Sequence, residues 1–322
     1  MLRGVSASQA DVSRADFALA CPACERPWPF PARDDGTRAP AGTAPVADAP
    51  ACPSCGHAAR WEDGVLVLDD LPGAGDYPAG AYDAVARVED RHWWYRSRND
   101  VIARALAGLT PGCAVEIGCG TGFVLAALER LGWRVLGLDM RIEGLRHARR
   151  RTDAPLVRTG AACVPLAAPV DLVVLCDVLE HTDEVPLVQA AVAALRPGGH
   201  VLVTVPARPS LWSSEDVFVG HRRRYTSETL LAALQHAGLH VVVLRPFHAC
   251  VTPLAARAVK KERAAAAPPS RDAWLAATAV PPRTSRTLLM RAALALENRL
   301  GARVPLPFGS ALLALARRET GM

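Results

Sequence analysis

The 322-residue sequence lacks long hydrophobic runs, and no segment reaches the 18 consecutive apolar residues expected of a membrane-spanning helix. The first 20 residues contain Asp11, Arg14 and Asp16 where a signal peptide would need an apolar stretch. A strong charge of one sign is also missing, because 37 basic and 32 acidic residues leave a net charge of only +5. We therefore expect a soluble cytoplasmic protein with a solvated, arginine-rich surface, and the charge gives no support to nucleic-acid binding.

The sequence also lacks an even number of cysteines. With nine, not all of them can pair in disulfide bonds, so the pattern does not suit a disulfide framework. Four of them form two Cys-x-x-Cys pairs, Cys21 with Cys24 and Cys52 with Cys55. Two such pairs can supply four thiolates to one tetrahedral zinc ion, which leaves no open position for chemistry. The pattern predicts a structural zinc ribbon in residues 1–75, where His57 could replace a thiolate but is not needed.

Residues 76–110 are helical in pattern, and residues 111–322 are expected to form an α/β domain. In this domain short apolar runs alternate with longer amphipathic stretches, which predicts a mostly parallel sheet with helices on both faces. Residues 249–305, rich in Ala, Leu and Arg, are expected to be a helical insertion. Strands are expected at 114–118, 134–138, 155–159, 171–176, 200–205 and 239–244.

The glycine-rich segment Gly118-Cys119-Gly120-Thr121-Gly122 lies between a predicted strand and a predicted helix. Glycines there let the backbone turn sharply and approach a ligand, and the helix amino terminus favours a ligand carboxylate. Asp139 ends the next strand, where a carboxylate can accept hydrogen bonds from both ribose hydroxyls of a nucleoside. Glu116 precedes the first glycine and would repel a pyrophosphate but tolerate a cationic sulfonium. A tight turn without a ligand is the plainer alternative.

These motifs resemble those of class I S-adenosylmethionine-dependent methyltransferases. The resemblance extends to Asp171–His181, to Leu195–Val203, to His221–Tyr225 and to the final apolar stretch near Ala311, so that it covers roughly residues 85–322. It implies a Rossmann-like sheet whose last strand is antiparallel. It also implies S-adenosylmethionine as cofactor, but the motifs are not specific for a substrate. Our main hypothesis is a small molecule as methyl acceptor, with an oxygen or a carbon as the accepting atom.

The resemblance implies a set of cofactor residues around the glycine loop and the ends of the following strands. This set is Glu116, Gly118, Cys119, Gly120, Gly122, Asp139, Met140, Asp177 and Val178. One departure concerns the adenine, because many relatives carry an acidic residue after the third strand. Here the corresponding stretch, residues 160–163, has no acid.

Methyl transfer to a hydroxyl, carbon acid or ammonium group also needs a base. His181 and His221 are the candidates, because one follows the predicted fourth strand and the other lies in a loop after the fifth. His181 could instead belong to a helix start capped by Asp183. Arg224 and Tyr225 are candidate substrate contacts, and the arginine run could bind an anionic group or be a solvated charge run.

Aromatic residues make up only 5% of the chain, yet several of them cluster just before the first predicted strand. His92, Trp93 and Tyr95 are predicted to fold over the pocket and exclude water, whereas Trp94 is expected to pack on the sheet. Nearer the carboxyl terminus, Leu289, Ala293, Leu296 and Leu300 share one helical face. With its flanking arginines, the segment 285–303 could contact a membrane surface, although packing over the core is the commoner outcome.

Three other functions remain open. An RNA methyltransferase could use the ribbon to bind RNA, but no Asn/Asp-Pro-Pro-Tyr stretch follows the fourth strand. A scaffold protein could keep the cofactor pocket without catalysis. An NAD-linked oxidoreductase is disfavoured because Phe123 stands beyond the last glycine of a G-x-G-x-G spacing and Glu116 would face a pyrophosphate.

Overall fold

The structure, a computed structural model, describes residues 17–29, 51–69, 77–78, 80–160, 163–265, 267, 270–278, 284–301 and 306–320. Several positions named in the sequence analysis lie outside these residues. They are positions 1–16, 30–50 and 70–75 of the expected zinc ribbon, 161–162 of the adenine stretch, and 266, 268–269, 279–283 and 302–305 of the expected insertion.

A nine-stranded sheet forms the centre of the described residues, in the order β10-β11-β9-β8-β5-β6-β7-β4-β3. The five central strands β9, β8, β5, β6 and β7 run parallel, as expected. The last strand, β11, lies between β10 and β9 and is antiparallel to both, which confirms the predicted topology. The sheet strands are β3 (Arg60–Glu62), β4 (Val65–Val67), β5 (Cys113–Ile117), β6 (Arg134–Asp139), β7 (Leu156–Arg158), β8 (Val170–Cys176), β9 (Leu195–Pro206), β10 (Leu239–Phe247) and β11 (Ala311–Arg318).

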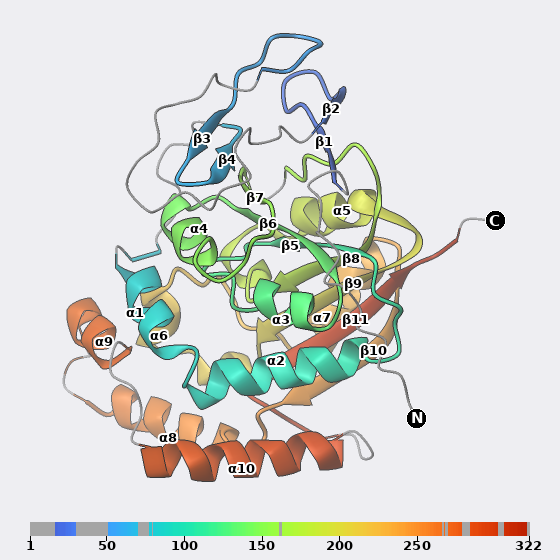
Figure 1. The fold of residues 1–322 in the computed structure, drawn as a ribbon. Helices are drawn as coiled ribbons and strands as arrows, with labels where there is room; N and C mark the ends of the chain where they lie inside the picture. Colours follow the sequence, from blue (N-terminus) through green and yellow to red (C-terminus); the bar gives the residue numbers. More distant parts are fainter. Residues whose placement is uncertain are drawn as a thin grey trace, which may run out of the picture.

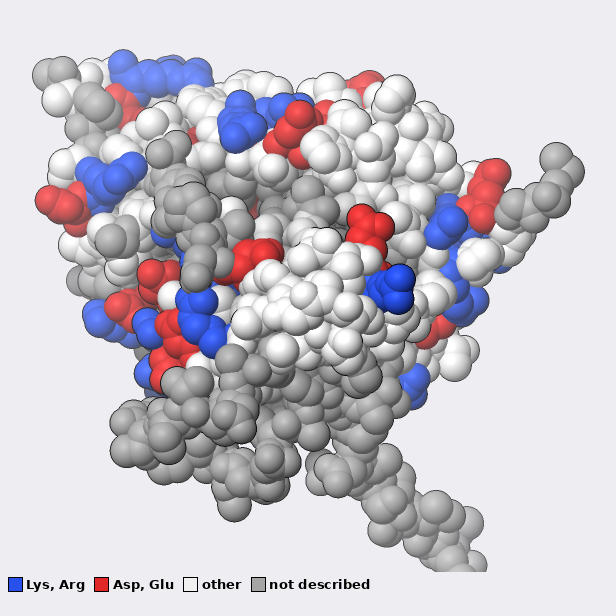
Figure 2. All heavy atoms as spheres, turned by 90° about the horizontal axis from the view of Figure 1, so that it is seen from above, with Lys and Arg blue, Asp and Glu red and all other residues white. Residues whose placement is uncertain are grey.

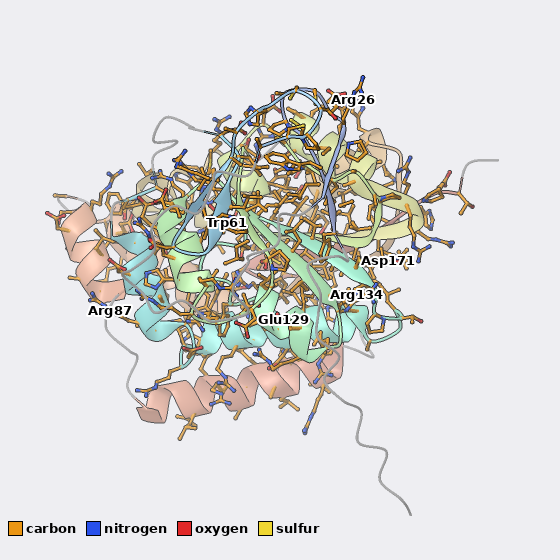
Figure 3. All side chains as sticks on the ribbon, turned by 45° about the horizontal axis from the view of Figure 1, so that its top comes forward. Arg26, Trp61, Arg87, Glu129, Arg134 and Asp171 are labelled. Atoms are coloured by element: carbon orange, nitrogen blue, oxygen red, sulfur yellow. The ribbon has the colours of Figure 1, made fainter. Side chains whose placement is uncertain are left out.

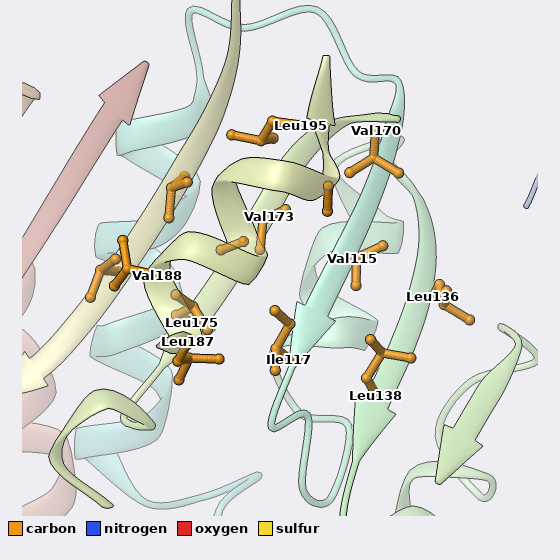
Figure 4. Packing of buried hydrophobic residues seen from close by; sticks show 14 of the residues in the cluster. Val115, Ile117, Leu136, Leu138, Val170, Val173, Leu175, Leu187, Val188 and Leu195 are labelled. Atoms are coloured by element: carbon orange, nitrogen blue, oxygen red, sulfur yellow. The ribbon is translucent and has the colours of Figure 1, made fainter. Parts of the chain in front are cut away.

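Helices cover both faces of this sheet (Figure 1). On one face lie α2 (Trp93–Leu106), α3 (Leu125–Arg130) and α4 (Ile142–Ala148), whose apolar side chains share a core with alternate strand residues. On the other lie α5 (Glu184–Ala194) and α7 (Ser227–His236). Leu187 and Val188 of α5 pack over Val173 and Leu175 of β8 (Figure 4). Because the central strands are buried on both faces, they read as continuous apolar runs, which made them recognisable in the sequence.

The amino-terminal segment is joined to the central sheet. Its strands β1 (Ala18–Ala20) and β2 (Pro27–Pro29) form a small hairpin, and β3 and β4 form another. The second hairpin turns at Asp63 and Gly64, whose φ angles of 49° and 80° suit a type I′ turn. Strand β4 pairs in parallel with β7, so this hairpin extends the large sheet at one edge. Phe17, Leu19 and Trp28 share a core with α5 and α7.

Two local features differ from the expected ones. Strand β9 begins at Leu195 and includes Pro197-Gly198-Gly199, because the chain already pairs with Val170 before an irregularity in the β8 register. A short helix, α6 (Ser214–Phe218), occupies the region after β9 that was expected to be a loop. Ser213 and Asp216 form a capping box there, which stabilises a helix too short to show a periodic pattern.

The insertion before β11 is helical, as expected, with α8 (Thr252–Arg263), α9 (Arg271–Thr278) and α10 (Thr284–Gly301). Helix α10 packs along α2 (Figure 1), and Leu294, Glu297 and Asn298 are buried on its inner side. The expectation that its leucine stripe covers the core is wrong, because Leu289, Leu296 and Leu300 are 74%, 58% and 53% exposed. Among the described helices, none is both long and apolar enough to cross a membrane.

Charges of both signs are mixed on the surface. Figure 2 shows one face of the molecule, on which basic and acidic side chains lie interspersed. At the amino ends of the parallel strands, Asp171 of β8 and Arg134 of β6 lie at one edge of the sheet (Figure 3). There Asp171 accepts hydrogen bonds from Cys113 N at 2.8 Å and from Arg196. The Asp171–Arg196 ion pair ties this edge together, whereas the opposite edge holds the candidate site.

Candidate functional site

The glycine loop follows β5 at the carboxyl edge of the sheet. Gly118, Gly120 and Gly122 have φ angles of 74°, 49° and 75°, a region that other residues rarely adopt. The space is also restricted, since a Cβ on Gly118 would lie 2.6 Å from Val178 Cγ2 and one on Gly122 would lie 2.8 Å from Ala148 Cβ. The backbone therefore needs glycine at these positions and bends into a cradle, residues 118–122, in which Gly118 N and Cys119 N both donate to Leu138 O.

Two buried carboxyl groups flank this cradle. Asp139, at the end of β6, accepts hydrogen bonds from Gly120 N at 2.8 Å and Arg141 N at 2.7 Å. Glu116, at 2% exposure, has an Oε2 without a hydrogen-bond partner among the described residues. Burial raises the pKa of Asp139, and burial raises the pKa of Glu116 well above its usual range although nearby Arg98 lowers it. A cationic group of a ligand could interact with the free oxygen of Glu116 and so compensate for the burial of this carboxyl.

The end of β8 contributes Asp177 and Val178. Asp177 has a φ of 55°, strained for a residue other than glycine, and such strain is common in functional loops. Its Oδ2 pairs with Arg98 at 2.5 Å, and Thr204 donates to its Oδ1 at 3.3 Å. Val178 packs against Gly118. The structure therefore brings the predicted residues from three strand ends to one place.

Helix α1 (Ala81–Val88) and the start of α2 close over the cradle from the side. Buried Glu89 accepts a hydrogen bond from Thr121 Oγ1 at 2.8 Å and pairs with Arg151 at 2.7 Å. Asn99 donates to Phe123 O at 3.1 Å. The Tyr82 ring would lie 3.4 Å from a Cβ on Gly120. These contacts hold the segment before β5 against the loop that follows it.

The aromatic residues of this segment form a cluster. The ring centroids of His92 and Trp93 are 5.1 Å apart, those of His92 and Tyr95 are 5.6 Å apart, and Tyr95 lies 6.4 Å from Phe123. His92 caps α2 by accepting from Trp94 N at 3.2 Å. Trp94 and Tyr95 also lie against the Arg98 guanidinium, at 5.1 Å and 5.8 Å. Tyr95 is thus beside the glycine loop, whereas Trp93 lines a cavity between α2 and α10.

The two candidate histidines meet on the other side of Asp177. The ring centroids of His181 and His221 are 4.7 Å apart. Burial and the neighbouring His221 lower the pKa of His181 to about 4, so its imidazole is neutral at pH 7. His221 Nδ1 lies 2.8 Å from Asp216 Oδ1, and Glu180, fully buried beside them, has two carboxyl oxygens without a hydrogen-bond partner among the described residues. Asp183 caps α5, as expected, by accepting from Val185 N.

Other predicted contacts are occupied within the protein. Arg224 Nε donates to Asp216 Oδ1 at 2.8 Å. Tyr225 is 1% exposed and donates to Glu184 Oε2 at 2.5 Å. The Cys119 thiol packs toward Gly137 of β6, and its backbone N donates to Leu138 O. Met140 is half-buried after Asp139, and its carbonyl accepts from Arg158.

The four cysteines of the amino-terminal segment converge. Their sulfur atoms all lie within 4.8 Å of one another, with Cys21 Sγ 3.7 Å from Cys55 Sγ and Cys24 Sγ 3.8 Å from Cys52 Sγ. Both pairs use the same backbone turn, in which Glu25 N donates to Cys21 O and Gly56 N donates to Cys52 O. His57 Nε2 instead bonds Leu68 O at 3.1 Å.

Sequence reasoning missed three charged residues of the site. Arg98 lies in the aromatic segment but reaches Asp177, 79 positions away. Asp216 and Glu180 act on His221 from a short helix and from a turn. The only sequence signal for Asp216 and Glu180 was proximity to the histidines, and Arg98 had none, because which charges are buried depends on non-local packing.

Comparison with known proteins points to methyltransferases. Residues 90–244 match the model of a family described as methyltransferase domain. The chain is 32% identical over 177 residues to a Mycolicibacterium smegmatis protein named as an S-adenosylmethionine-dependent methyltransferase, covering 53% of this chain and 68% of that protein. It is 34% identical over 162 residues to a ubiquinone biosynthesis O-methyltransferase of Cupriavidus pinatubonensis, covering 42% of this chain and 64% of that protein.

Among solved structures, the chain resembles a Haloferax volcanii methyltransferase in complex with the Trm112 methyltransferase activator. The TM-score is 0.49 at 21% identity, with 76% of this chain and 97% of that chain covered. The sequence match to the Mycolicibacterium protein covers more than two thirds of that relative. The chain therefore belongs to the S-adenosylmethionine-dependent methyltransferases.

Proposed function

We propose that the chain transfers the methyl group of S-adenosylmethionine to an oxygen atom of a small molecule. The observation that carries this proposal is the polar cluster of His181, His221 and Glu180 beside Asp177, at the carboxyl edge of the sheet. Ligands of open α/β sheets bind at this edge. The relatives named as ubiquinone biosynthesis O-methyltransferases support an oxygen acceptor.

The proposed cofactor residues are those that the cradle brings together. The glycine loop would take the methionine part, with Glu116 beside it, and a cationic cofactor would favour the ionised form of this carboxyl, which burial disfavours. Asp139 keeps acceptor capacity on both carboxylate oxygens, because each backbone hydrogen bond uses only one lone pair. S-adenosylmethionine supplies an electrophilic methyl group on a sulfonium. The Arg98–Asp177 ion pair would fix the position of Asp177 beside the cradle. Tyr95 and Tyr82 would exclude water from the methyl group.

Transfer requires that the acceptor hydroxyl lose its proton. The groups placed to act on it are His181 and His221, whose rings touch and face the buried Glu180. Asp216 orients His221 through Nδ1, which leaves Nε2 directed at Glu180. The proposed acceptor site is thus separate from the cofactor cradle but adjacent to it through Asp177 and Val178.

The experiment is methyl transfer from labelled S-adenosylmethionine to a panel of phenols, catechols, carboxylic acids, amines and unmodified RNA. Labelled ethers from the phenols or catechols are the expected products. If His221→Asn loses these products but still binds the cofactor normally, the substitution impairs the acceptor site and not the cofactor site. Transfer only to amines or RNA would contradict the proposal. The mixed surface charges already give RNA little support (Figure 2).

We propose in addition that the four cysteines hold a structural zinc ion. A tetrahedral site with zinc–sulfur bonds of ~2.3 Å places neighbouring sulfurs roughly 3.8 Å apart. The two sulfur pairs, at 3.7 Å and 3.8 Å, fit this spacing and are far too long for a disulfide bond. The expected result of elemental analysis is that Cys24→Ser holds one equivalent of zinc per chain less than wild type.

We also propose that α10 contacts a membrane surface. Its exposed face carries Leu289, Leu296 and Leu300, with Arg291 and Arg299 exposed on the same helix. Leucines that enter the headgroup region beside basic residues favour anionic lipids. Co-sedimentation with vesicles of anionic lipid, lost in the Leu289→Asp/Leu296→Asp variant and weak with neutral lipid, is the expected result.

A further inference from the structure

We propose that Glu180, His181 and His221 form a second metal site, which binds a divalent ion of the zinc type beside the cofactor cradle. The inference rests on the proposed oxygen acceptor for its role in catalysis, but the site itself is argued from the ligand geometry. It is distinct from the cysteine cluster, in which Cys21 and Cys24 lie between β1 and β2 and Cys52 and Cys55 precede β3.

The three side chains offer one ligand atom each, and these atoms all lie within 4.8 Å of one another. Glu180 Oε1 is 3.8 Å from His221 Nε2. Ligand atoms bound to one zinc ion at ~2.1 Å lie roughly 3.4 Å apart in tetrahedral geometry. Small side-chain rotations would therefore bring the three atoms to binding distance without a change of the backbone.

Glu180 provides an independent observation. Its side chain is fully buried, and neither carboxyl oxygen has a hydrogen-bond partner among the residues that the structure describes. A buried polar group without a partner is costly, and native proteins rarely retain one without a compensating ligand. His221 Nε2, at 3.8 Å, is too distant for a hydrogen bond. A cation held between Glu180 and the two imidazoles would satisfy both oxygens.

The surroundings of His221 suit a metal ligand. Its Nδ1 faces Asp216 Oδ1 at 2.8 Å, and because an ionised carboxylate only accepts hydrogen bonds, Nδ1 is the donor. The neutral tautomer then carries its lone pair on Nε2, directed at Glu180. Asp216 is itself fixed by Ser213 N at 2.8 Å and Arg224 Nε at 2.8 Å. A carboxylate behind a ligating histidine is the usual outer partner of a protein metal site.

Two imidazoles and one carboxylate are a donor set of catalytic zinc sites, which keep a position open for water or substrate. The open position would receive the acceptor hydroxyl and lower its pKa, so that its proton leaves to water. The resulting oxygen attacks the methyl carbon, an O–C bond forms while the C–S bond breaks, and the sulfur keeps the electron pair. In this arrangement the histidines activate the acceptor as ligands rather than as bases.

The test counts bound metal and does not depend on knowing the acceptor. Full-length protein is equilibrated with Zn²⁺, freed of excess, and analysed for zinc per chain. Glu180→Gln and His221→Asn are expected to bind one equivalent less than wild type, while their cysteines stay protected from thiol reagents. His236→Asn, on the exposed end of α7, is the matched control and is expected to keep the wild-type zinc content.

A second readout covers the case in which a variant folds poorly. Zn²⁺ is expected to raise the urea midpoint of Cys24→Ser, in which the cysteine site is disabled, and to have no such effect on Cys24→Ser/Glu180→Gln. Equal zinc content in wild type, Glu180→Gln and His221→Asn, with no midpoint shift in Cys24→Ser, would overturn the proposal. If zinc is lost as expected but no oxygen acceptor is methylated, the site stands and the proposed function fails.

Discussion

The Gly118→Ala substitution tests whether the cofactor cradle depends on glycine for the two reasons that the structure gives. The first reason is the backbone, because φ at this position is 74° and an L-residue there costs about 1–2 kcal/mol. The second is space, because the new Cβ would lie 2.6 Å from Val178 Cγ2 and 3.3 Å from its Cγ1. Relieving such an overlap costs about 1–3 kcal/mol more. We therefore expect a loss of about 2–5 kcal/mol in the free energy of unfolding.

A double-mutant cycle separates these two contributions. Val178→Ala removes both overlapping methyl groups and leaves Val178 Cβ at an ordinary 3.6 Å. In Gly118→Ala/Val178→Ala the steric part is relieved and the backbone part remains, so we expect a favourable coupling of about 1–3 kcal/mol. Gly108→Ala is the control, since a Cβ there meets nothing within 4 Å and φ is ordinary.

The assay is urea unfolding of the four proteins and the control, together with S-adenosylmethionine titration by calorimetry. Gly118→Ala is expected to bind the cofactor at least tenfold more weakly, and the double variant to recover part of this loss. Additive free energies in the cycle would refute the proposed contact between Gly118 and Val178. Unchanged cofactor affinity in Gly118→Ala would refute the role of this loop.

The remaining predictions concern the carboxylate, the cysteines and a buried histidine. Asp139→Ala is expected to weaken S-adenosylmethionine binding by at least 100-fold in calorimetry, because hydrogen bonds to a charged group contribute about 1.5–3 kcal/mol each. The control variant Asp153→Ala, at an exposed position, should bind the cofactor normally. Cys52→Ser should lose zinc and lower the urea midpoint, because Cys52 is buried in the core shared with the sheet, whereas Cys250→Ser should do neither. Burial lowers the pKa of His248 to about 3, so the unfolded state binds more protons between pH 6.5 and 3 and stability falls as the pH falls through that window. His248→Asn, whose side chain tolerates the φ of 62°, should flatten this part of the stability profile, and an unchanged slope would contradict the assignment.

The central strands could be predicted because their physical signals are local. Strand β8 is an apolar run buried on both faces, and β6 ends at Asp139 where the chain leaves the sheet. The glycines in the loop after β5 predicted a backbone conformation that other residues rarely adopt. These signals lie within a few residues of one another, and the structure confirms the elements they predict.

The attachment of the amino-terminal hairpin could not be predicted in the same way. Asp63-Gly64 is a recognisable hairpin turn, but nothing near it in the sequence indicates that β4 pairs with β7, about 90 residues later. The outward orientation of the α10 leucines could not be predicted either, because it also depends on a distant part of the chain. A helical stripe fixes which residues share a face, whereas the neighbour, here α2, decides which face is buried.

In the site, the sequence indicated the histidines but not the groups that control them. His221 depends on Asp216 in a five-residue helix, and Asp177 depends on Arg98, which precedes the first strand of the domain. Arg224 and Tyr225 were predicted to contact substrate, yet the structure pairs them with Asp216 and Glu184. Such pairing follows from long-range packing, which a motif does not encode.

The most direct test of the cofactor assignment is calorimetric titration of the purified wild-type chain with S-adenosylmethionine and, separately, with NADH. The cradle with its buried, unpartnered Glu116 predicts micromolar binding of S-adenosylmethionine and no measurable binding of NADH, whose anionic pyrophosphate this carboxyl could not neutralise. Binding of NADH in preference to S-adenosylmethionine would contradict the account.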